Sequence, residues 1–272
     1  MMKVVNLNTY PINDDKSSNY QSIIQSSISQ LDSQGFVKLH NFLQPEIVDE
    51  LTSSMLQLEQ RGIGFYSNNS HNVFLEDDGS SESASSPSLN PHHIQLNSSK
   101  LILNAKDLVA HTELNDLFTS KSFISFISSI LQVTLYPSTD PYGRYYGNIF
   151  NVGDKLDWHF DRSQFSVSLI LQPAQEGGEF QFAPNSREVV RDWDKMPLDL
   201  EEVSQKLEKH SKIVHRPVLS AGDMYIFHGQ NALHRVSEIT KGTRINIILT
   251  YNTKMNVELN SYTLKKFFGV EK

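Results

Sequence analysis

The chain has 272 residues, and its 38% hydrophobic content is sufficient for the core of one domain. A formal net charge of −7 disfavours binding to nucleic acid, because phosphate backbones attract basic surfaces. The sequence contains no cysteine, which excludes disulfides, thiolate ligands and iron–sulfur clusters.

The N-terminus does not resemble a secretory signal, because Asn6, Pro11 and Asp14 follow the first apolar residues too closely. No stretch of the chain approaches the run of about 18 apolar residues that marks a membrane span. We therefore expect a soluble protein of the cytoplasm or an organellar lumen, with no membrane partner.

The N-terminal region predicts a helix, a short strand and a second helix. We expect the helices at 17–34 and 45–61, with the strand at 35–40 between them. Pro45 suits the first turn of the second helix. Apolar residues then recur at helical spacing, at Ile47, Leu51, Met55 and Leu58. Such an opening is typical of the outer support of a β-barrel.

A polar segment follows, and it predicts a long loop. Residues 66–99 are rich in Ser, Asn, Asp and Gly and lack a periodic apolar pattern. Loops of this length in a compact domain are usually functional lids or disordered segments. Beyond it, the apolar spacing from Leu114 to Leu131 indicates one or two amphipathic helices.

From Tyr145 onward the pattern is mostly β. Phe165 to Leu171 alternates bulky and small residues, and residues 198–209 predict a charged helix on the rim. We predict a mainly β, α+β fold: a double-stranded β-helix of the jelly-roll, cupin-like type with its site at the open mouth.

We expect a single domain over residues 1–272. In this division, residues 1–140 give helical support and the lid loop at 66–99. Residues 141–253 form the catalytic jelly-roll core, and residues 254–272 are a C-terminal extension.

Three possible metal ligands lie in the β-rich half. His159 and Asp161 are two residues apart, and His234 lies far downstream. Alternate side chains of a β-strand share a face, so the first two can reach one ion. Two histidines and one carboxylate form the facial triad of non-haem Fe(II) enzymes. We therefore predict His159, Asp161 and His234 as the metal ligands and catalytic centre.

An arginine begins the apolar strand that follows His234. If Arg244 points inward it needs a partner, because an unpaired buried guanidinium is very costly. A dicarboxylate cosubstrate would supply one through two parallel hydrogen bonds. An ion pair with an acidic residue of the protein is the alternative, but the order of His159, Asp161, His234 and Arg244 favours the cosubstrate. We also predict Asn246 on this strand as a cosubstrate contact.

This combination of residues resembles the Fe(II)/2-oxoglutarate-dependent oxygenase superfamily over residues 140–252. Three segments are similar to the clade of amino-acid radical halogenases, their hydroxylating relatives and the algal kainoid synthases: 158–163, 177–180 and 233–236. The resemblance implies an oxidoreductase, a dioxygenase that uses Fe(II), 2-oxoglutarate and O2, with ascorbate as reductant. In the halogenases a small residue replaces the acidic ligand, so that chloride can bind iron. Because this chain keeps Asp161, we expect no halogenation.

A further resemblance lies just before the first histidine. Asn148-x-Phe150-x-x-Gly153 is similar to the Asn-x-Tyr-x-x-Gly strand that contacts 2-oxoglutarate in some branches of the superfamily. It implies that Asn148 binds the cosubstrate, although Phe150 lacks the tyrosine hydroxyl. A polar residue at a strand end is an equally good interpretation of Asn148.

Cationic and polar residues near these motifs suggest a small, anionic, amino-acid-like substrate. The candidate contacts are Arg162, Tyr145, Tyr146, His71 and Asn72. Because neighbours on a strand point in opposite directions, an outward ion pair is the alternative for Arg162.

Within the superfamily we favour a natural-product reaction, the oxidative cyclisation of an N-prenylated glutamate that kainoid synthases perform. Hydroxylation or desaturation of an amino acid is the first alternative. The second is a different class of protein: a zinc hydrolase, since two histidines and a carboxylate also serve catalytic zinc, or a non-catalytic cupin-like metal-binding protein.

Overall fold

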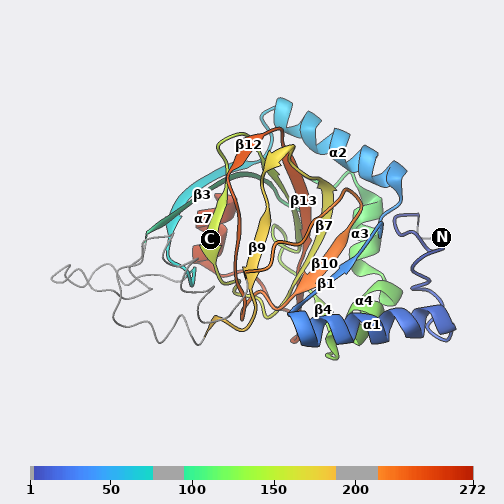
Figure 1. The fold of residues 1–272 in the computed structure, drawn as a ribbon. Helices are drawn as coiled ribbons and strands as arrows, with labels where there is room; N and C mark the ends of the chain where they lie inside the picture. The colour runs from blue at the N-terminus through green and yellow to red at the C-terminus, as the bar shows by residue number, and fades with distance from the viewer. Residues whose placement is uncertain (1–2, 76–94, 188–213, 272) are drawn as a thin grey trace.

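The computed structural model describes residues 3–75, 95–187 and 214–271. Within these residues a larger sheet of seven strands faces a smaller sheet of three (Figure 1). The larger sheet has the order β1 (Phe36–Leu39), β10 (Met224–Phe227), β7 (Ser166–Gln172), β13 (Arg244–Leu249), β5 (Tyr145–Phe150), β3 (Leu96–Leu103) and β2 (Phe65–His71). The smaller sheet has the order β6 (Leu156–His159), β11 (Leu233–Val236) and β9 (Phe180–Ala183). Two short pairs complete the β-structure: β12 (Ile239–Lys241) with β8 (Glu176–Gly177), and β14 (Tyr251–Asn252) with β4 (Tyr136–Pro137).

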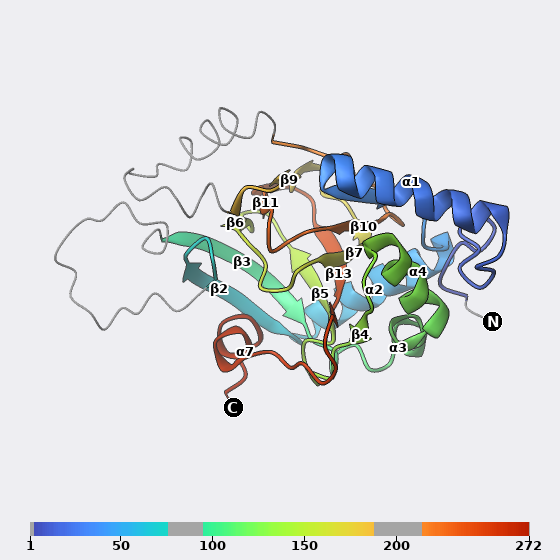
Figure 2. The ribbon, with the colours of Figure 1, turned by 90° about the horizontal axis from the view of Figure 1, so that it is seen from below.

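Four helices cover the outer face of the larger sheet (Figure 2): α1 (Ser18–Gln34), α2 (Pro45–Gln60), α3 (Thr112–Thr119) and α4 (Lys121–Leu131). The hydroxyl of Ser17 accepts a hydrogen bond from the backbone N–H of Tyr20 (3.2 Å), which caps α1. The helices bury apolar residues against outward-facing side chains of the sheet, including Val167, Leu169, Ile245 and Ile247. This layer is the main hydrophobic core.

The inner face of the larger sheet borders a cavity of about 480 Å³. Strand alternation divides β13 between the two sides: Arg244, Asn246 and Ile248 line the cavity, while Ile245 and Ile247 pack into the core. The smaller sheet supplies the opposite wall with His159, Phe180 and His234. Both faces of the larger sheet are therefore covered. Helices pack against the outer face, and the inner face borders the cavity, whose opposite wall is the smaller sheet.

These observations confirm the predicted mainly β, α+β fold. The two N-terminal helices and the strand between them lie where the sequence places them, and the segment from Leu114 to Leu131 forms α3 and α4. The C-terminal extension contains a helix that we did not predict, α7 (Ser261–Phe268). In the described part of the chain, no helix is both long enough and apolar enough to cross a bilayer.

The predicted loop at 66–99 is wrong at both ends. β2 pairs with β3 along the whole length of β2, from Phe65 opposite Ile102 to His71 opposite Leu96. The polar side chains of β2 have polar partners: Ser67 Oγ and Asn69 Nδ2 both donate to the backbone oxygen of Lys266 in α7. A strand of this kind has no alternating apolar pattern. The centre of the predicted loop, and the predicted helix at 198–209, lie outside the described residues.

Candidate metal centre

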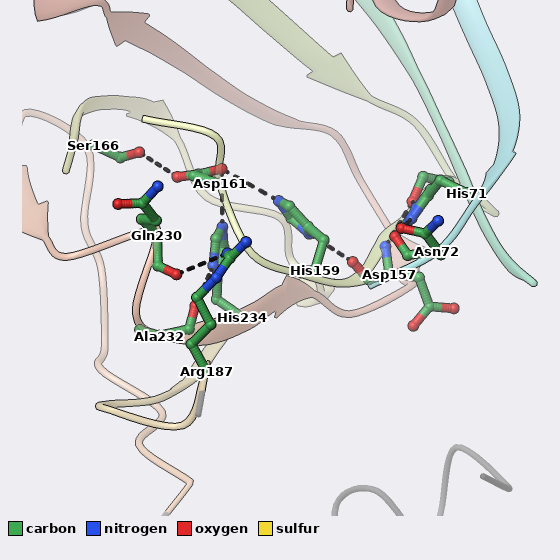
Figure 3. A network of polar contacts seen from close by, with 11 residues as sticks. His71, Asn72, Asp157, His159, Asp161, Ser166, Arg187, Gln230, Ala232 and His234 are labelled. Carbon is green, nitrogen blue, oxygen red and sulfur yellow. Dashed lines mark hydrogen bonds and ion pairs between the residues drawn. The ribbon is translucent and has the colours of Figure 1, made fainter. Parts of the chain in front are cut away.

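The two histidines of the predicted triad come together because their strands pair. β6 and β11 are antiparallel neighbours, and their register places His234 directly opposite His159. The two rings are 4.1 Å apart between centroids. Both side chains are buried, and Figure 3 shows them pointing toward the same carboxylate.

Backbone carbonyls fix the orientation of both imidazoles. His159 Nδ1 donates to the oxygen of Asp157 (2.7 Å), and His234 Nδ1 donates to the oxygen of Ala232 (2.8 Å) (Figure 3). With the proton on Nδ1, each ring presents the lone pair of Nε2 to the site. Burial, and then the proximity of His234, lowers the pKa of His159 to about 4. Its ring is therefore neutral near pH 7, as a metal ligand must be.

Asp161 completes the group from the turn that follows β6. Its Oδ1 is 3.5 Å from His159 Nε2 and 3.4 Å from His234 Nε2. Its Oδ2 accepts a hydrogen bond from Ser166 Oγ (Figure 3). Burial alone would raise the pKa of Asp161, but His234 and His159 outweigh it and hold that pKa well below its ordinary value. One oxygen thus faces both histidines, and the other is held by the protein.

A glycine makes this position possible. The backbone N–H of Asp161 donates to the oxygen of Gly229 (3.0 Å). A Cβ atom at Gly229 would lie 2.2 Å from Asp161 Oδ2, so any larger residue would displace the carboxylate. Nothing in the sequence pattern marks Gly229 for this role.

The donor set fits a divalent transition metal. One ligand atom from each of His159, Asp161 and His234 lies within 4.8 Å of the other two. Ligands about 2.1 Å from an ion, on adjacent octahedral vertices, stand about 3 Å apart. The distances of 3.4 and 3.5 Å from Asp161 Oδ1 to the two histidine Nε2 atoms would therefore have to shorten slightly when an ion binds.

Arg244 lies on the opposite wall, at the start of β13. Its side chain is buried, and burial lowers the pKa of its guanidinium despite a hydrogen bond with Tyr225. Among the described residues, Arg244 Nε and Nη2 have no hydrogen-bond partner. Gly178 has a φ of +64°, and an added Cβ there would lie 2.5 Å from Ile239 Cδ1 and in ordinary van der Waals contact, 3.5 Å, with Arg244 Cδ. The Gly177-Gly178 motif thus packs against the stem of this arginine.

The two predicted asparagines share that wall. Asn246 and Asn148 are directly opposite in the pairing of β13 with β5, and both line the cavity. Asn246 Nδ2 donates to Ser168 Oγ (3.1 Å), and Asn148 Oδ1 has no hydrogen-bond partner in the described part of the chain. The free donors of Arg244 match the acceptors of a carboxylate. The wall therefore fits the far end of a dicarboxylate cosubstrate.

The predicted substrate contacts separate into two groups. Tyr146 and Arg162 line the cavity, and Arg162 Nη1 donates to the oxygen of Leu75 (2.9 Å). Tyr145 points to the other side of the sheet, where its ring packs 5.4 Å from that of Phe118. The structure does not bring Tyr145 to the cavity.

His71 and Asn72 do not line the cavity either. His71 contacts Ser98 Oγ (2.6 Å) and the oxygen of Asn72 (3.0 Å), and Asn72 Oδ1 accepts from the backbone N–H of Phe74 (3.0 Å). Ser98 Oγ also accepts from the backbone N–H of Asp157 (2.8 Å). Through Ser98, His71 is therefore connected to the strand that carries His159.

Sequence reasoning missed four residues of the cavity and its surroundings: Lys100, Ser166, Tyr225 and Gly229. Lys100 directly follows the segment 66–99 that was predicted as a loop, so its strand was not recognised, although it shares a strand face with Leu96 and Ile102. Ser166 begins the strand after the metal motif, and its role depends on the turn between them. Tyr225 contacts Arg244 from β10, a long-range contact without a local signal.

Solved structures of 2-oxoglutarate–iron(II) oxygenases share this fold. An oxidoreductase of that family from Burkholderia pseudomallei is 13% identical, with a TM-score of 0.52 over 85% of this chain and 91% of its own. A prolyl hydroxylase from Trichoplax adhaerens, in complex with a hypoxia inducible factor peptide fragment, is 16% identical, with a TM-score of 0.54 over 88% and 96%. HygX from Streptomyces hygroscopicus, solved with nickel and 2-oxoglutarate bound, is 12% identical, with a TM-score of 0.53 over 87% and 89%.

Fold, family match and donor set define the class of protein: an Fe(II)/2-oxoglutarate-dependent oxygenase. Within that class the chain belongs to the halogenase D family, whose model matches residues 19–266. No curated protein matches the chain.

Proposed function

We propose that this protein oxidises a C–H bond of a small, anionic substrate without transferring a halogen. Iron would be held by His159, Asp161 and His234, and 2-oxoglutarate by Arg244 with Asn148 and Asn246. The observation that carries the proposal is the position of Asp161, whose Oδ1 lies 3.5 and 3.4 Å from the two histidine Nε2 atoms.

The position of Asp161 argues against halogen transfer, although the family is named for halogenases. A halogenating centre needs an iron position at which a halide can replace the carboxylate. Here the carboxylate is present, is partly buried beside the two histidines and is held on its far oxygen by Ser166.

When bound, Fe(II) with 2-oxoglutarate and O2 supplies an oxidant that can remove a hydrogen atom from an unactivated carbon. The chain contributes position and exclusion of water. Backbone carbonyls orient His159 and His234, and Ser166 orients Asp161. The cavity walls restrict the substrate so that one C–H bond faces the metal.

A zinc hydrolase would use the same donor set but leaves the opposite wall unexplained. Arg244 is buried with two free donor nitrogens among the described residues, which zinc hydrolysis does not require. A dicarboxylate that chelates the metal at one end and reaches Arg244 at the other would give the metal a ligand and the guanidinium a hydrogen-bonded partner. This favours the oxygenase over the hydrolase and over a metal-binding protein without turnover.

We further infer that residues 1–272 act as one functional domain. The cavity is lined from all three parts of the chain: Lys100 from the N-terminal part, Asn246 from the jelly-roll core, and Leu259 and Phe268 from the C-terminal extension. Removal of the extension is therefore expected to open the cavity, which truncation after residue 253 would test.

Mass spectrometry of aerobic reactions tests the proposed chemistry. The enzyme would be supplied with Fe(II), ascorbate, 2-oxoglutarate and chloride, and offered a panel of amino acids that includes N-prenylated glutamates. We expect succinate together with an unhalogenated product. A product one oxygen heavier identifies a hydroxylase, and one two hydrogens lighter identifies a desaturase or the oxidative cyclisation of a kainoid synthase. A chlorinated product would overturn the proposal.

An anaerobic measurement tests the metal assignment without turnover. Fe(II) with 2-oxoglutarate should give a visible absorption band, because the keto acid chelates the metal. Zn(II) in place of Fe(II) should give no band. If the Fe(II) sample also remains colourless, the iron-oxygenase assignment fails at its first step.

A further inference from the structure

A buried lysine faces the cavity from β3, the strand next to β5 in the larger sheet. Lys100 lies on β3, and its side chain is 7% exposed. It lines the cavity together with Ile102 of the same strand. Strand alternation explains the arrangement, because Leu96, Ser98, Lys100 and Ile102 share one buried face.

The strand registers place this lysine in line with Arg244. β13 pairs Arg244 with Phe150, and β5 pairs with β3 so that Ile149 lies opposite Leu101. The inward-facing row next to Asn246 and Asn148 thus runs from Arg244 through Phe150 to Lys100. Strands are about 4.8 Å apart, so the backbones at the two ends of the row are separated by about 10 Å. The ammonium of Lys100 lies 5.7 Å from the centre of the Phe150 ring, and Phe150 occupies the strand position between Lys100 and Arg244.

Lys100 has no carboxylate within ion-pair distance among the described residues. Lysines elsewhere in the described part of the chain, such as Lys155, Lys241 and Lys265, lie 2.9 to 3.3 Å from a carboxylate oxygen. Burial lowers the pKa of Lys100 to about 8, and Asp161 is the charge that opposes this effect. A buried ammonium with an aromatic face as its contact is costly to the fold. An anionic ligand would compensate that cost.

We propose that Lys100 binds a carboxylate of the substrate, while Arg244 binds the far carboxylate of the cosubstrate. This inference rests on the proposed function and adds to it the substrate class: a small carboxylic acid, anchored at Lys100 and oxidised at a carbon nearer the metal. Two cations in one row, separated by Phe150, suit two different carboxylates better than a single shared one.

The test compares acids with their amides on two variants. The probes are a pool of the L-amino acids and a pool of the corresponding carboxamides, each offered to protein loaded with Fe(II) and 2-oxoglutarate. Wild-type protein should form succinate faster with the acids than with the amides. Lys100→Met should lose at least about ten-fold of the stimulation by acids, since a hydrogen bond to a charged group contributes about 1.5–3 kcal/mol. Lys121→Met, on the exposed start of α4, is the matched control and should behave as wild type.

Two further readouts separate the failure of this inference from the failure of the proposed function. The absorption band with 2-oxoglutarate should survive in Lys100→Met, because Arg244 and not Lys100 is assigned to the cosubstrate. Lys100→Arg should recover part of the stimulation by acids. In an anaerobic thermal-shift measurement, the acid pool should stabilise the loaded wild-type protein and leave the melting temperature of Lys100→Met unchanged.

Several results would overturn the inference. Equal stimulation by acids and amides would show that no carboxylate is recognised. A Lys100→Met variant that keeps its response to acids, or a wild-type protein that the acid pool does not stabilise, would exclude this role for Lys100. A variant that loses the 2-oxoglutarate band instead would assign Lys100 to the cosubstrate. Absence of the band in wild-type protein would contradict the proposed function itself.

Discussion

The two walls of the cavity differ in how their buried polar groups are satisfied. On the smaller sheet, His159, His234 and Asp161 each have a hydrogen-bond partner within the chain and face one another. On the larger sheet, Arg244 and Lys100 are buried cations that face the cavity without a carboxylate partner among the described residues. The first wall is preorganised for a metal, and the second is electrostatically incomplete until anions bind. This difference indicates which changes should affect the metal and which should affect the organic ligands.

The largest effect is expected from removal of the carboxylate on the metal wall. Asp161→Ala should abolish substrate oxidation and weaken Fe(II) binding, because two histidines alone leave the metal with one fewer anchor and no compensating charge. Succinate formation and the iron content of the purified variant would be measured together. Asp116→Ala, an exposed carboxylate on α3, is the matched control. Full activity in Asp161→Ala would mean that the triad is misassigned.

The next largest effect is expected on the opposite wall. Arg244→Leu should raise the concentration of 2-oxoglutarate needed for half-maximal succinate formation by about 100-fold. Removing one partner of a buried charge pair costs about 2–5 kcal/mol, and every 1.4 kcal/mol is tenfold. Binding of Fe(II) measured without the keto acid should stay close to that of wild type. Arg61→Leu, an exposed arginine after α2, is the control. An unchanged requirement for 2-oxoglutarate would place its far carboxylate elsewhere.

A smaller effect is expected from a change beside the metal that removes no ligand. In Gly229→Ala the new methyl group would overlap Asp161 Oδ2, so the carboxylate must move. We expect Fe(II) affinity to fall about 10- to 100-fold, the range typical of altered outer contacts of metal ligands. Ser166→Ala removes a hydrogen bond from the same oxygen without a clash and should lose less. A Fe(II) titration that places both variants at the wild-type affinity would show that the orientation of Asp161 is not critical.

The same two walls show what sequence patterns can reveal. The spacing of His159 and Asp161, the downstream His234 and the strand-initial Arg244 were predictable because each motif carries a chemical reason for its residue types. The sequence did not show which residues of the larger sheet face the cavity and which face the helices. That sheet is buried on both faces, so the apolar pattern of β5 could not show that Tyr146 faces the cavity and Tyr145 the helices.

Lys100 was unpredictable for a related reason. Its strand, β3, pairs with the polar edge strand β2, whose Ser67 and Asn69 are satisfied by the backbone of α7. Such long-range partners are not visible in composition, and a Ser- and Asn-rich segment therefore read as a loop.

The smallest predicted effect concerns stability and separates ligand-binding cations from structural ones. Burial lowers the pKa of Lys100 from 10.5 to about 8, so its ammonium form is disfavoured in the folded state. The resulting penalty is complete below pH 8 and disappears above pH 10.5, where the lysine is neutral in both states. Lys100→Met should therefore raise the free energy of unfolding near pH 7, by on the order of 1–3 kcal/mol, while removing the response to acids.

Denaturant unfolding of the ligand-free protein at pH 7 and pH 10 measures this. The gain should be larger at pH 7, because Lys100 is then charged. Asp161 and His71 interact electrostatically with Lys100. The other titratable or charged groups that line the cavity are Tyr146, His159, Arg162, Tyr225, His234, Arg244, Tyr251, Lys254 and Glu258. They remain in the variant, so the difference between variant and wild type isolates the lysine. Lys121→Met should show no such pH dependence. A Lys100→Met protein that is less stable than wild type at pH 7 would make this lysine part of the structural framework, and the two walls would then differ less than we infer.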